Sequence, residues 1–147
     1  MSTTSSITAK CKDGRFRSIY VHWDGHIEWV GRLLLENYTE QDKIEKLLSL
    51  GSISILAPSI ECPEGHTFDS PIDGYTIAYY RDRDRAWGMY HTIVEDTRAG
   101  CLRKNGQEYN YFWDGEKWTV GYSFKDVFNA DLKEEWELYQ KEVRENE

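Results

Sequence analysis

The chain has 147 residues, of which 39% are hydrophobic, 30% charged and 14% aromatic, and its formal net charge at pH 7 is −8. This length and composition fit one folded domain over residues 1–147 and exclude an intrinsically disordered chain. The acidic balance argues against direct nucleic-acid binding, because generic nucleic-acid binders carry a basic excess on the body or on an arm.

The N-terminal segment predicts a β-hairpin. Ile7–Lys10 and Phe16–Trp23 are rich in residues that favour strands, and the Lys12-Asp13-Gly14 sequence between them is a turn signal. The second strand is expected to end where Asp24-Gly25 introduces another turn.

Two short helices are predicted after this turn. The apolar period changes to that of an amphipathic helix from about His26 to Tyr38. Thr39 with Asp42 three residues later resembles a capping box, which predicts a second helix that stops near Gly51.

The middle of the chain contains a long loop and a strand that ends in arginines. All three prolines lie in the segment from about Ala57 to Gly74, and loops of this length in compact domains are usually functional. Tyr75–Arg81 has the composition of a strand, whereas residues 82–100 fit neither a helix nor a strand well.

A second hairpin gives the clearest local pattern. Glu108–Trp113 and Glu116–Tyr122 are rich in aromatic residues and are joined by Asp114-Gly115, a sequence that favours a type I′ turn. Two-residue alternation places the larger side chains of each strand on one face.

The C-terminal segment from Ser123 to Glu147 predicts a long acidic helix, packed on the domain or projecting from it. Ser123 is its expected N-cap, with Asp126 at the third position. Eight acidic and three basic residues lie between Asp126 and Glu147, whereas the remaining 125 residues are close to neutral. An apolar stripe runs opposite the acidic face and consists of Phe128, Leu132, Trp136, Tyr139 and Val143. We therefore predict an α+β fold with an antiparallel sheet of β-hairpins, two inserted short helices and a long C-terminal helix.

Sequence features also bear on where the protein acts. No stretch reaches the length of about 18 apolar residues that a membrane span requires, and the first residues lack the basic and apolar regions of a signal peptide. Cys11, Cys62 and Cys101 are odd in number and show no CxxC spacing. We therefore expect reduced thiols in a cytoplasm and no membrane association.

Catalytic and metal-binding patterns are weak. His22 and His26 are four residues apart, as are Cys62 and His66, but a turn interrupts the first pair and no second cysteine accompanies the second. Nucleophile-elbow, zinc-protease and glycine-rich phosphate motifs are absent from the sequence. We expect no catalytic residue, no metal and no cofactor.

The first candidate site is a row of alternate arginines, Arg81, Arg83 and Arg85, which we call the arginine comb. If the strand that begins at Tyr75 continues, alternate arginines point to one face beside aromatic rings. Guanidinium groups bind phosphate and stack on rings, as a nucleotide ligand would require. The predicted ligand-binding residues are Arg81, Arg83, Arg85, Tyr79, Trp23 and Trp87. The alternative is that Asp82 and Asp84 pair with these arginines at a solvated strand end.

The acidic helix is the second candidate site. Its carboxylates could imitate a phosphate backbone and occupy a basic groove on another protein. The predicted partner-binding residues are Asp131, Glu134, Glu135, Glu142 and Glu145. The alternative is an ordinary solvated helix face, because lysine and arginine residues are interspersed among the acids.

Two segments resemble a known family. Tyr20–Gly25 reads YVHWDG, and Tyr79–Arg83 reads YYRDR. Both resemble segments of a family of small bacteriophage and prophage proteins in which a leucine-rich LLExY helix follows the first motif. The likeness extends over Leu33–Tyr38, Lys46–Ile53, Gly65–Asp69 and Tyr109–Trp118. It implies a phage accessory protein in the cytoplasm of a bacterial host, and it brings no functional residues with it.

Taken together, these features predict a non-enzymatic binding protein that antagonises a bacterial defence system. The first hypothesis is sequestration of a nucleotide-derived immune signal at the arginine comb. The alternative is an acidic inhibitor that docks on a host defence or nucleic-acid enzyme, such as an anti-CRISPR or nucleic-acid mimic. Exposed aromatic strands would also permit a homo-oligomer.

Overall fold

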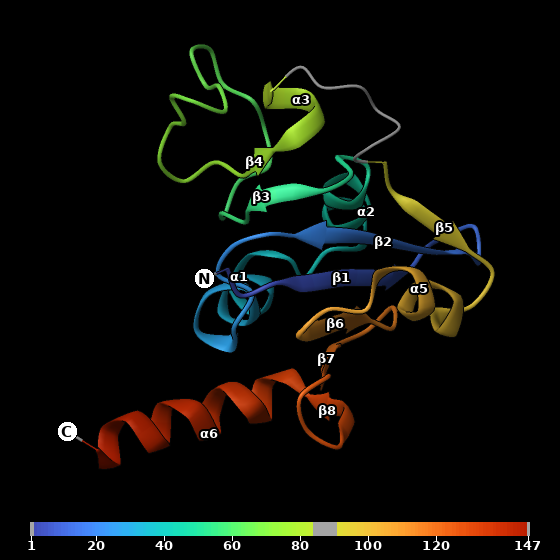
Figure 1. The fold of residues 1–147 in the computed structure, drawn as a ribbon, viewed down its shortest axis with the longest axis vertical. Coiled ribbons are helices and arrows are strands. Elements are labelled where there is room, and N and C mark those ends of the chain that lie inside the picture. Colours follow the sequence, from blue (N-terminus) through green and yellow to red (C-terminus); the bar gives the residue numbers. More distant parts are fainter. Residues whose placement is uncertain (1, 84–90, 147) are drawn as a thin grey trace.

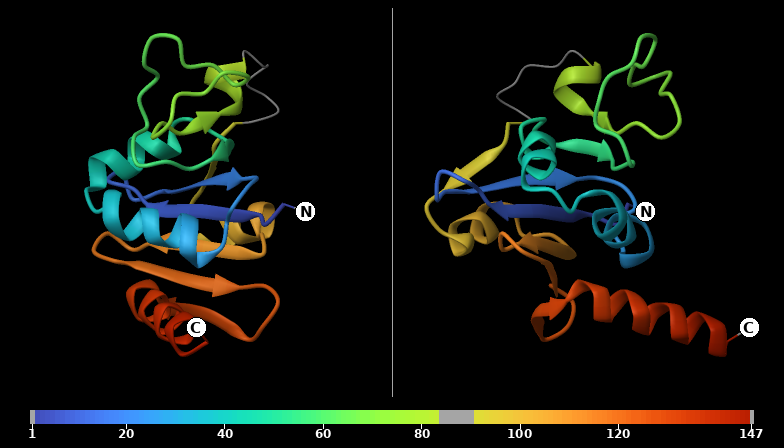
Figure 2. Two further views of the ribbon diagram at one scale, coloured as in Figure 1. Left: turned by 90° about the vertical axis from the view of Figure 1, so that its left-hand side faces the viewer. Right: turned by 180° about the vertical axis from the view of Figure 1, so that it is seen from behind.

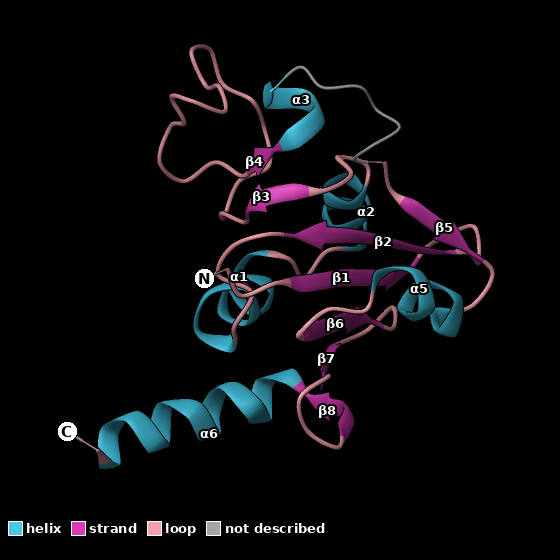
Figure 3. Cartoon of the chain, in the orientation of Figure 1, coloured by secondary structure: helices cyan, strands magenta, loops and turns pink. Residues whose placement is uncertain are grey.

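The computed structural model describes residues 2–83 and 91–146, and it confirms the α+β class (Figure 1). Figure 3 separates the strands from the helices. The strands are β1 (Ser5–Lys10), β2 (Phe16–Val21), β3 (Ile53–Ile55), β4 (Ile77–Ala78), β5 (Ile93–Glu95), β6 (Tyr109–Trp113), β7 (Trp118–Tyr122) and β8 (Val127–Asp131). The helices are the π-helical turn η1 (Ile27–Gly31), α1 (Arg32–Asn37), α2 (Gln41–Leu48), α3 (Tyr79–Arg83), α5 (Arg98–Asn105) and α6 (Leu132–Glu145).

The sheet is mixed rather than wholly antiparallel. Its strand order is β4-β3-β2-β1-β6-β7-β8, and β5 also pairs with β2. The β1–β2 and β6–β7 neighbours are antiparallel hairpins, as expected, and β7–β8 is a further antiparallel pair that the sequence did not predict. However, β1 pairs with β6 in parallel, and β2 pairs with β3 in parallel. The central strand β1 therefore joins segments that lie about a hundred residues apart in the sequence.

One face of the sheet carries the apolar core. Helices α1 and α2 lie on this side, whereas α5 lies on the opposite side (Figure 2). The side chains that the sheet contributes alternate along the strands, as the aromatic pattern of the second hairpin predicted. They include Ile7, Ala9, Ile19, Val21, Tyr111, Trp113, Trp118, Val120 and Tyr122.

The opposite face of the sheet is polar although much of it is buried. Thr8 Oγ1 lies 2.8 Å from Ser18 Oγ, and Asn105 Nδ2 of α5 donates to the same Ser18 oxygen at 2.9 Å. Ser6 Oγ donates to Asn110 Oδ1 at 2.7 Å. These bonds satisfy polar groups that would otherwise be costly to bury.

The turn after β2 approaches β1 closely. Asp24 adopts a positive φ of 55°, and a Cβ atom on Gly25 would lie 2.8 Å from the Cβ atom of Ser5. The helix predicted from His26 is present, but its first turn, η1, is π-helical and only the second part is α-helical. The predicted capping box is wrong, because the N-cap of α2 is Glu40 and no side chain caps it.

The second hairpin is confirmed, but its turn and the segment that follows it differ from expectation. A type I′ turn needs positive φ at both central residues, whereas only Gly115 of the Asp114-Gly115 pair has one. Ser123 does not cap a helix: the chain forms β8 first, and α6 begins at Leu132 with Asp131 as its N-cap. Phe128, which was predicted to begin the apolar stripe of the helix, therefore lies on the edge strand β8 instead.

Removing the Tyr111 hydroxyl should destabilise the fold. This group is buried and donates to the Gly25 carbonyl at 2.6 Å, so Tyr111→Phe leaves that carbonyl oxygen without this donor. We expect a loss of roughly 1.5 kcal/mol in the free energy of unfolding, measured by urea denaturation. Tyr109→Phe is the matched control on the same strand face, and an equal loss in both variants would contradict the assignment.

Candidate functional site

The arginine comb does not form as predicted, because its strand ends early. Tyr79–Arg83 is the short helix α3, and only Ile77–Ala78 is extended. Successive residues of a helix are turned by about 100°, so Arg81 and Arg83 point in different directions. The premise of a common face for these arginines is therefore wrong.

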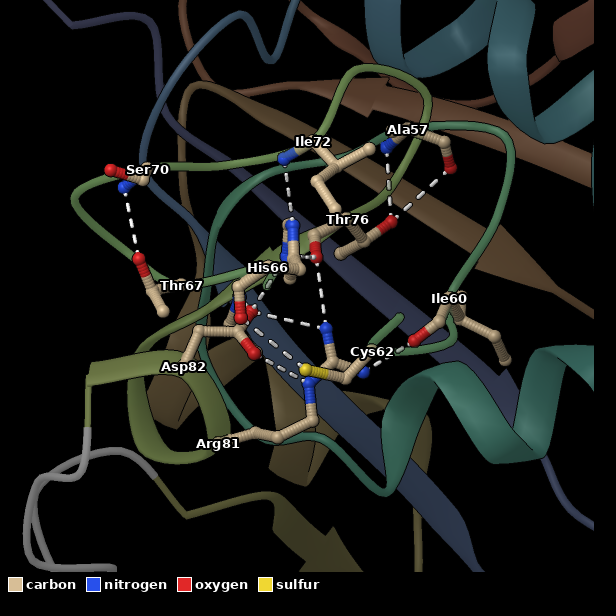
Figure 4. A network of polar contacts seen from close by, with 11 residues as sticks. Ala57, Ile60, Cys62, His66, Thr67, Ser70, Ile72, Thr76, Arg81 and Asp82 are labelled. Atoms are coloured by element: carbon tan, nitrogen blue, oxygen red, sulfur yellow. Dashed lines mark hydrogen bonds and ion pairs between the residues drawn. The ribbon is translucent and has the colours of Figure 1, made fainter. Parts of the chain in front are cut away.

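Arg81 is directed into the loop from about Ala57 to Gly74, which we call the proline-containing loop (Figure 4). Its Nε donates to Asp82 Oδ1 at 2.7 Å, and its Nη2 donates to Asp82 Oδ2 at 3.0 Å and to the Thr76 carbonyl at 2.9 Å. Its Nη1 donates to the Ile60 carbonyl. Four of its donor contacts are thus made within the fold. The alternative had proposed that aspartates pair with these arginines at a solvated strand end, whereas the Asp82 side chain is buried and the pair belongs to a helix.

Asp82 is the centre of this network. Its side chain is fully shielded from solvent, and Oδ2 also accepts the Ala78 backbone N–H at 2.7 Å. Burial acts to raise the pKa of the Asp82 carboxyl, but the hydrogen bonds from Arg81 and Ala78 and the Arg81 charge outweigh it, so the pKa is lowered. The carboxylate therefore connects α3 to the Ala78 backbone, which precedes the helix, and to His66 of the proline-containing loop.

The other predicted ligand-binding residues are dispersed. The Arg83 guanidinium lies over the Phe68 ring at 4.8 Å, and it also lies over the buried Tyr79 ring. Trp23 is 44% exposed beyond the end of β2, where its ring meets the edge of His22. Arg85 and Trp87 lie outside the described residues.

His66 and Cys62 do not form a catalytic pair. His66 is buried, its Nδ1 accepts the Ile72 N–H at 3.0 Å, and its Nε2 lies 3.2 Å from the Thr76 carbonyl and 3.3 Å from Asp82 Oδ2. Cys62 contacts the backbone carbonyl of His66. Burial and the Asp82 charge raise the pKa of its thiol, whereas a nucleophilic cysteine needs a lowered one. Over residues 2–83 and 91–146, no three histidine, cysteine or acidic side chains are grouped so as to hold a metal ion.

The predicted acidic residues divide between structural and exposed positions. Asp131 Oδ1 accepts the Lys133 N–H at 3.0 Å as the N-cap of α6. Glu135 accepts a hydrogen bond from the Tyr122 hydroxyl at 2.7 Å. Glu134, Glu142 and Glu145 are exposed along the helix, and α6 extends away from the sheet (Figure 1).

Beside α6 lies an aromatic hollow, which we define by Ile27, Tyr109, Phe124 and Tyr139. Two adjoining cavities of about 470 and 260 Å³ share these four residues. The Phe124 ring lies 5.3 Å from that of Tyr109, and it is 57% exposed. The hollow therefore offers aromatic surface to an incoming group rather than only to the core.

Carboxylates outnumber cations around the aromatic hollow. The acidic residues lining its two cavities are Glu28, Glu108, Glu135 and Glu142, and the basic ones are His26 and Lys125. The Tyr139 hydroxyl donates to Glu28, and this bond raises the pKa of the phenol. Lys125 lies 4.4 Å from the centre of the Tyr122 ring, so one cation already occupies aromatic surface at this end.

The sequence pattern had identified α6 but not this hollow. Phe124 was placed inside the expected helix, and strand alternation placed Tyr109 on one face with the other large side chains of its strand. Leu138, which is 53% exposed on α6, lies outside the predicted apolar stripe. The signal that could have revealed the site is the excess of aromatic residues at both ends of the second hairpin.

Comparisons with known proteins add no family or function. No protein-family model matches the sequence, and neither a curated protein nor a solved structure matches it significantly. In the described part of the chain, no helix is both long and apolar enough to cross a membrane. The geometry of the sites therefore carries the functional argument.

Replacing Asp82 by Asn should loosen the proline-containing loop. Arg81 would lose its buried counter-ion, so we expect a loss of about 3 kcal/mol in the free energy of unfolding at pH 7, measured by urea denaturation. Folding lowers the carboxyl pKa below its ordinary value of 3.8, so the stabilisation is present above that value and is lost as the pH falls through the lowered pKa. The difference from wild type should therefore shrink in acid.

The matched control for this prediction is Asp73→Asn, which changes an exposed carboxylate of the same loop. It should leave stability within about 0.5 kcal/mol of wild type. Equal stability of Asp82→Asn and Asp73→Asn at pH 7 would show that the buried pair does not hold the loop.

Proposed function

We propose that this protein is a non-enzymatic binding protein that antagonises a bacterial defence system by docking on a basic surface of a host defence or nucleic-acid enzyme. The observation that carries the proposal is the aromatic hollow bordered by carboxylates beside the exposed acidic side of α6. The resemblance of Tyr20–Gly25 and Tyr79–Arg83 to phage proteins supports the setting, which is the cytoplasm of an infected bacterium.

The chemistry of the aromatic hollow suits a lysine or arginine side chain. Aromatic faces attract cations, and this attraction strengthens when the cation is desolvated. The carboxylates of Glu108 and Glu142 would add charge-assisted hydrogen bonds to the same group. A basic residue of the partner therefore fits as the central anchor, with Phe124 as the ring that it contacts first.

The charge of α6 favours a basic partner over a second copy of the chain. Between Asp131 and Glu145 there are six acidic and three basic residues. Pairing two such helices would bring like net charges together, which disfavours association through this face. A basic partner surface would instead be attracted and steered towards the helix.

The acidic docking mode is better supported by geometry than ligand sequestration at the arginine comb. Most donors of Arg81 are bonded within the fold, and Arg83 covers Phe68 and Tyr79. Neither arginine is therefore free to bind phosphate without breaking an internal contact. Sequestration remains the competing hypothesis, and its site would have to lie elsewhere on the molecule.

Charge reversal on α6 tests the docking mode. Affinity purification from phage-sensitive bacteria that carry defence systems would identify the partner, whose binding is then measured by biolayer interferometry. Glu142→Lys with Glu145→Lys should reduce the association rate about tenfold and weaken its dependence on salt. Plating efficiency of phage on the same bacteria should fall in parallel.

The matched control is Asp69→Lys with Asp73→Lys, which makes the same change in net charge on the proline-containing loop and should leave binding unaltered. Phe124→Ala should weaken binding by about 2 kcal/mol if the ring contacts the anchor residue. Native mass spectrometry supplies the contrary outcome. A small molecule that is carried by the intact protein and released unchanged on denaturation, with no protein partner, would refute docking and favour sequestration.

A further inference from the structure

A cavity separate from the aromatic hollow lies on the polar face of the sheet, between α5 and β8. Its volume is about 820 Å³, and its lining combines one guanidinium group with amides, hydroxyls and apolar side chains. The residues used below are Arg98, Gln107, Glu108, Asn110, Gly121 and Phe128. We call this cavity the α5 groove.

Arg98 is a half-buried cation that has no acidic partner among residues 2–83 and 91–146. Its guanidinium carbon lies 4.1 Å from the centre of the Phe112 ring, Nη1 donates to Asn129 Oδ1 at 2.9 Å and Nη2 lies 3.4 Å from the Phe128 carbonyl. Burial lowers its pKa. Among the described residues, no carboxylate lies within ion-pair distance of it, in contrast to Arg81.

An unpaired, partly desolvated guanidinium is costly for a fold to maintain. Stacking on Phe112 holds the plane of the group in place, and the bond to Asn129 fixes one side of it. A planar, fixed guanidinium is preorganised to bind an oxyanion through two parallel hydrogen bonds. The missing counter-ion is therefore the part that an anionic ligand would supply.

The remaining walls of the α5 groove suit a flat ring. Phe128 is 74% exposed on the edge strand β8, and an exposed ring of this kind is a stacking surface for a base. Gly121 faces Asn110 across the β6–β7 pair, and its lack of a side chain lets the β8 backbone approach, since a Cβ atom there would lie 2.7 Å from the Phe128 carbonyl oxygen. Gln107 and Asn110 add amide groups along the same wall.

Glu108 limits the charge that the ligand can carry. Its Oε1 lies 3.4 Å from the Thr4 backbone nitrogen, and its carboxylate lines the α5 groove without reaching Arg98. A second anionic group at this position would be repelled, whereas a ribose hydroxyl or an exocyclic amine could donate to it. One cation and one carboxylate together fit a ligand with a single phosphate.

We propose that the α5 groove binds a nucleoside monophosphate, with the phosphate on Arg98 and the base against Phe128. This site lies on the opposite face of the β6–β7 hairpin from most of the aromatic hollow, although Glu108 and Tyr122 line both, and it does not depend on the proposed docking function. The α5 groove and the arginine comb have no residue in common.

Isothermal titration of the full chain with AMP, GMP, CMP and UMP tests the proposal. We expect at least one of the four to bind, with Arg98→Gln weakening it about tenfold through loss of a charged hydrogen bond. Arg103→Gln changes an exposed arginine of the same helix and should have no effect. Phe128→Ala removes an exposed ring, is expected to leave folding intact, and should weaken binding roughly tenfold.

Three results would overturn the proposal. The first is no binding of any monophosphate at millimolar concentration. The second is equal affinity for inorganic phosphate and for the nucleotides, because the ring would then contribute nothing. The third is tighter binding of a single-stranded oligonucleotide than of a mononucleotide, since the α5 groove would then be a binding site for single-stranded nucleic acid.

Discussion

The parallel pairing of β1 with β6 is the constraint on which the rest of the structure depends. It places Ser5 opposite Tyr109 and Ala9 opposite Trp113, so the N-terminal hairpin and the aromatic hairpin form one sheet. A parallel neighbour requires a long crossover connection, and the proline-containing loop and every helix of the described residues except α6 lie within it. The aromatic hollow and the α5 groove both border the start of β6, which this pairing places between β1 and β7.

Two arginines show how the same side chain is used in opposite ways. Arg81 has a buried carboxylate beside it, and the resulting pair fastens the proline-containing loop to α3. Arg98 instead contacts the Phe112 ring and the Asn129 amide, which position the guanidinium group but carry no negative charge. A neighbouring carboxylate therefore decides whether a guanidinium is bound within the fold, as for Arg81, or lies at a cavity wall, as for Arg98.

Local sequence patterns predicted the elements whose partners are near in the chain. The aromatic hairpin was found because Trp113 and Trp118 are separated only by a turn, and α6 was found from its periodicity. Tyr79–Arg83 was predicted as a strand because its composition favours one. The helix forms instead because Asp82 accepts the Ala78 N–H and meets His66 from a distant part of the loop. Neither the β1–β6 register nor the position of Phe128 has a local signal, so both sites were missed.

Strand β6 carries aromatic residues on both of its faces. Tyr109 and Tyr111 point towards the core side, where Tyr111 is buried and Tyr109 reaches the aromatic hollow. Asn110 and Phe112 point the other way, towards the α5 groove and the stacked Arg98. A core strand with one solvated face would need aromatic residues at alternate positions only. Because Arg98 covers Phe112 on one face while Tyr111 and Trp113 pack into the core on the other, the second half of β6 buries aromatic side chains at three consecutive positions.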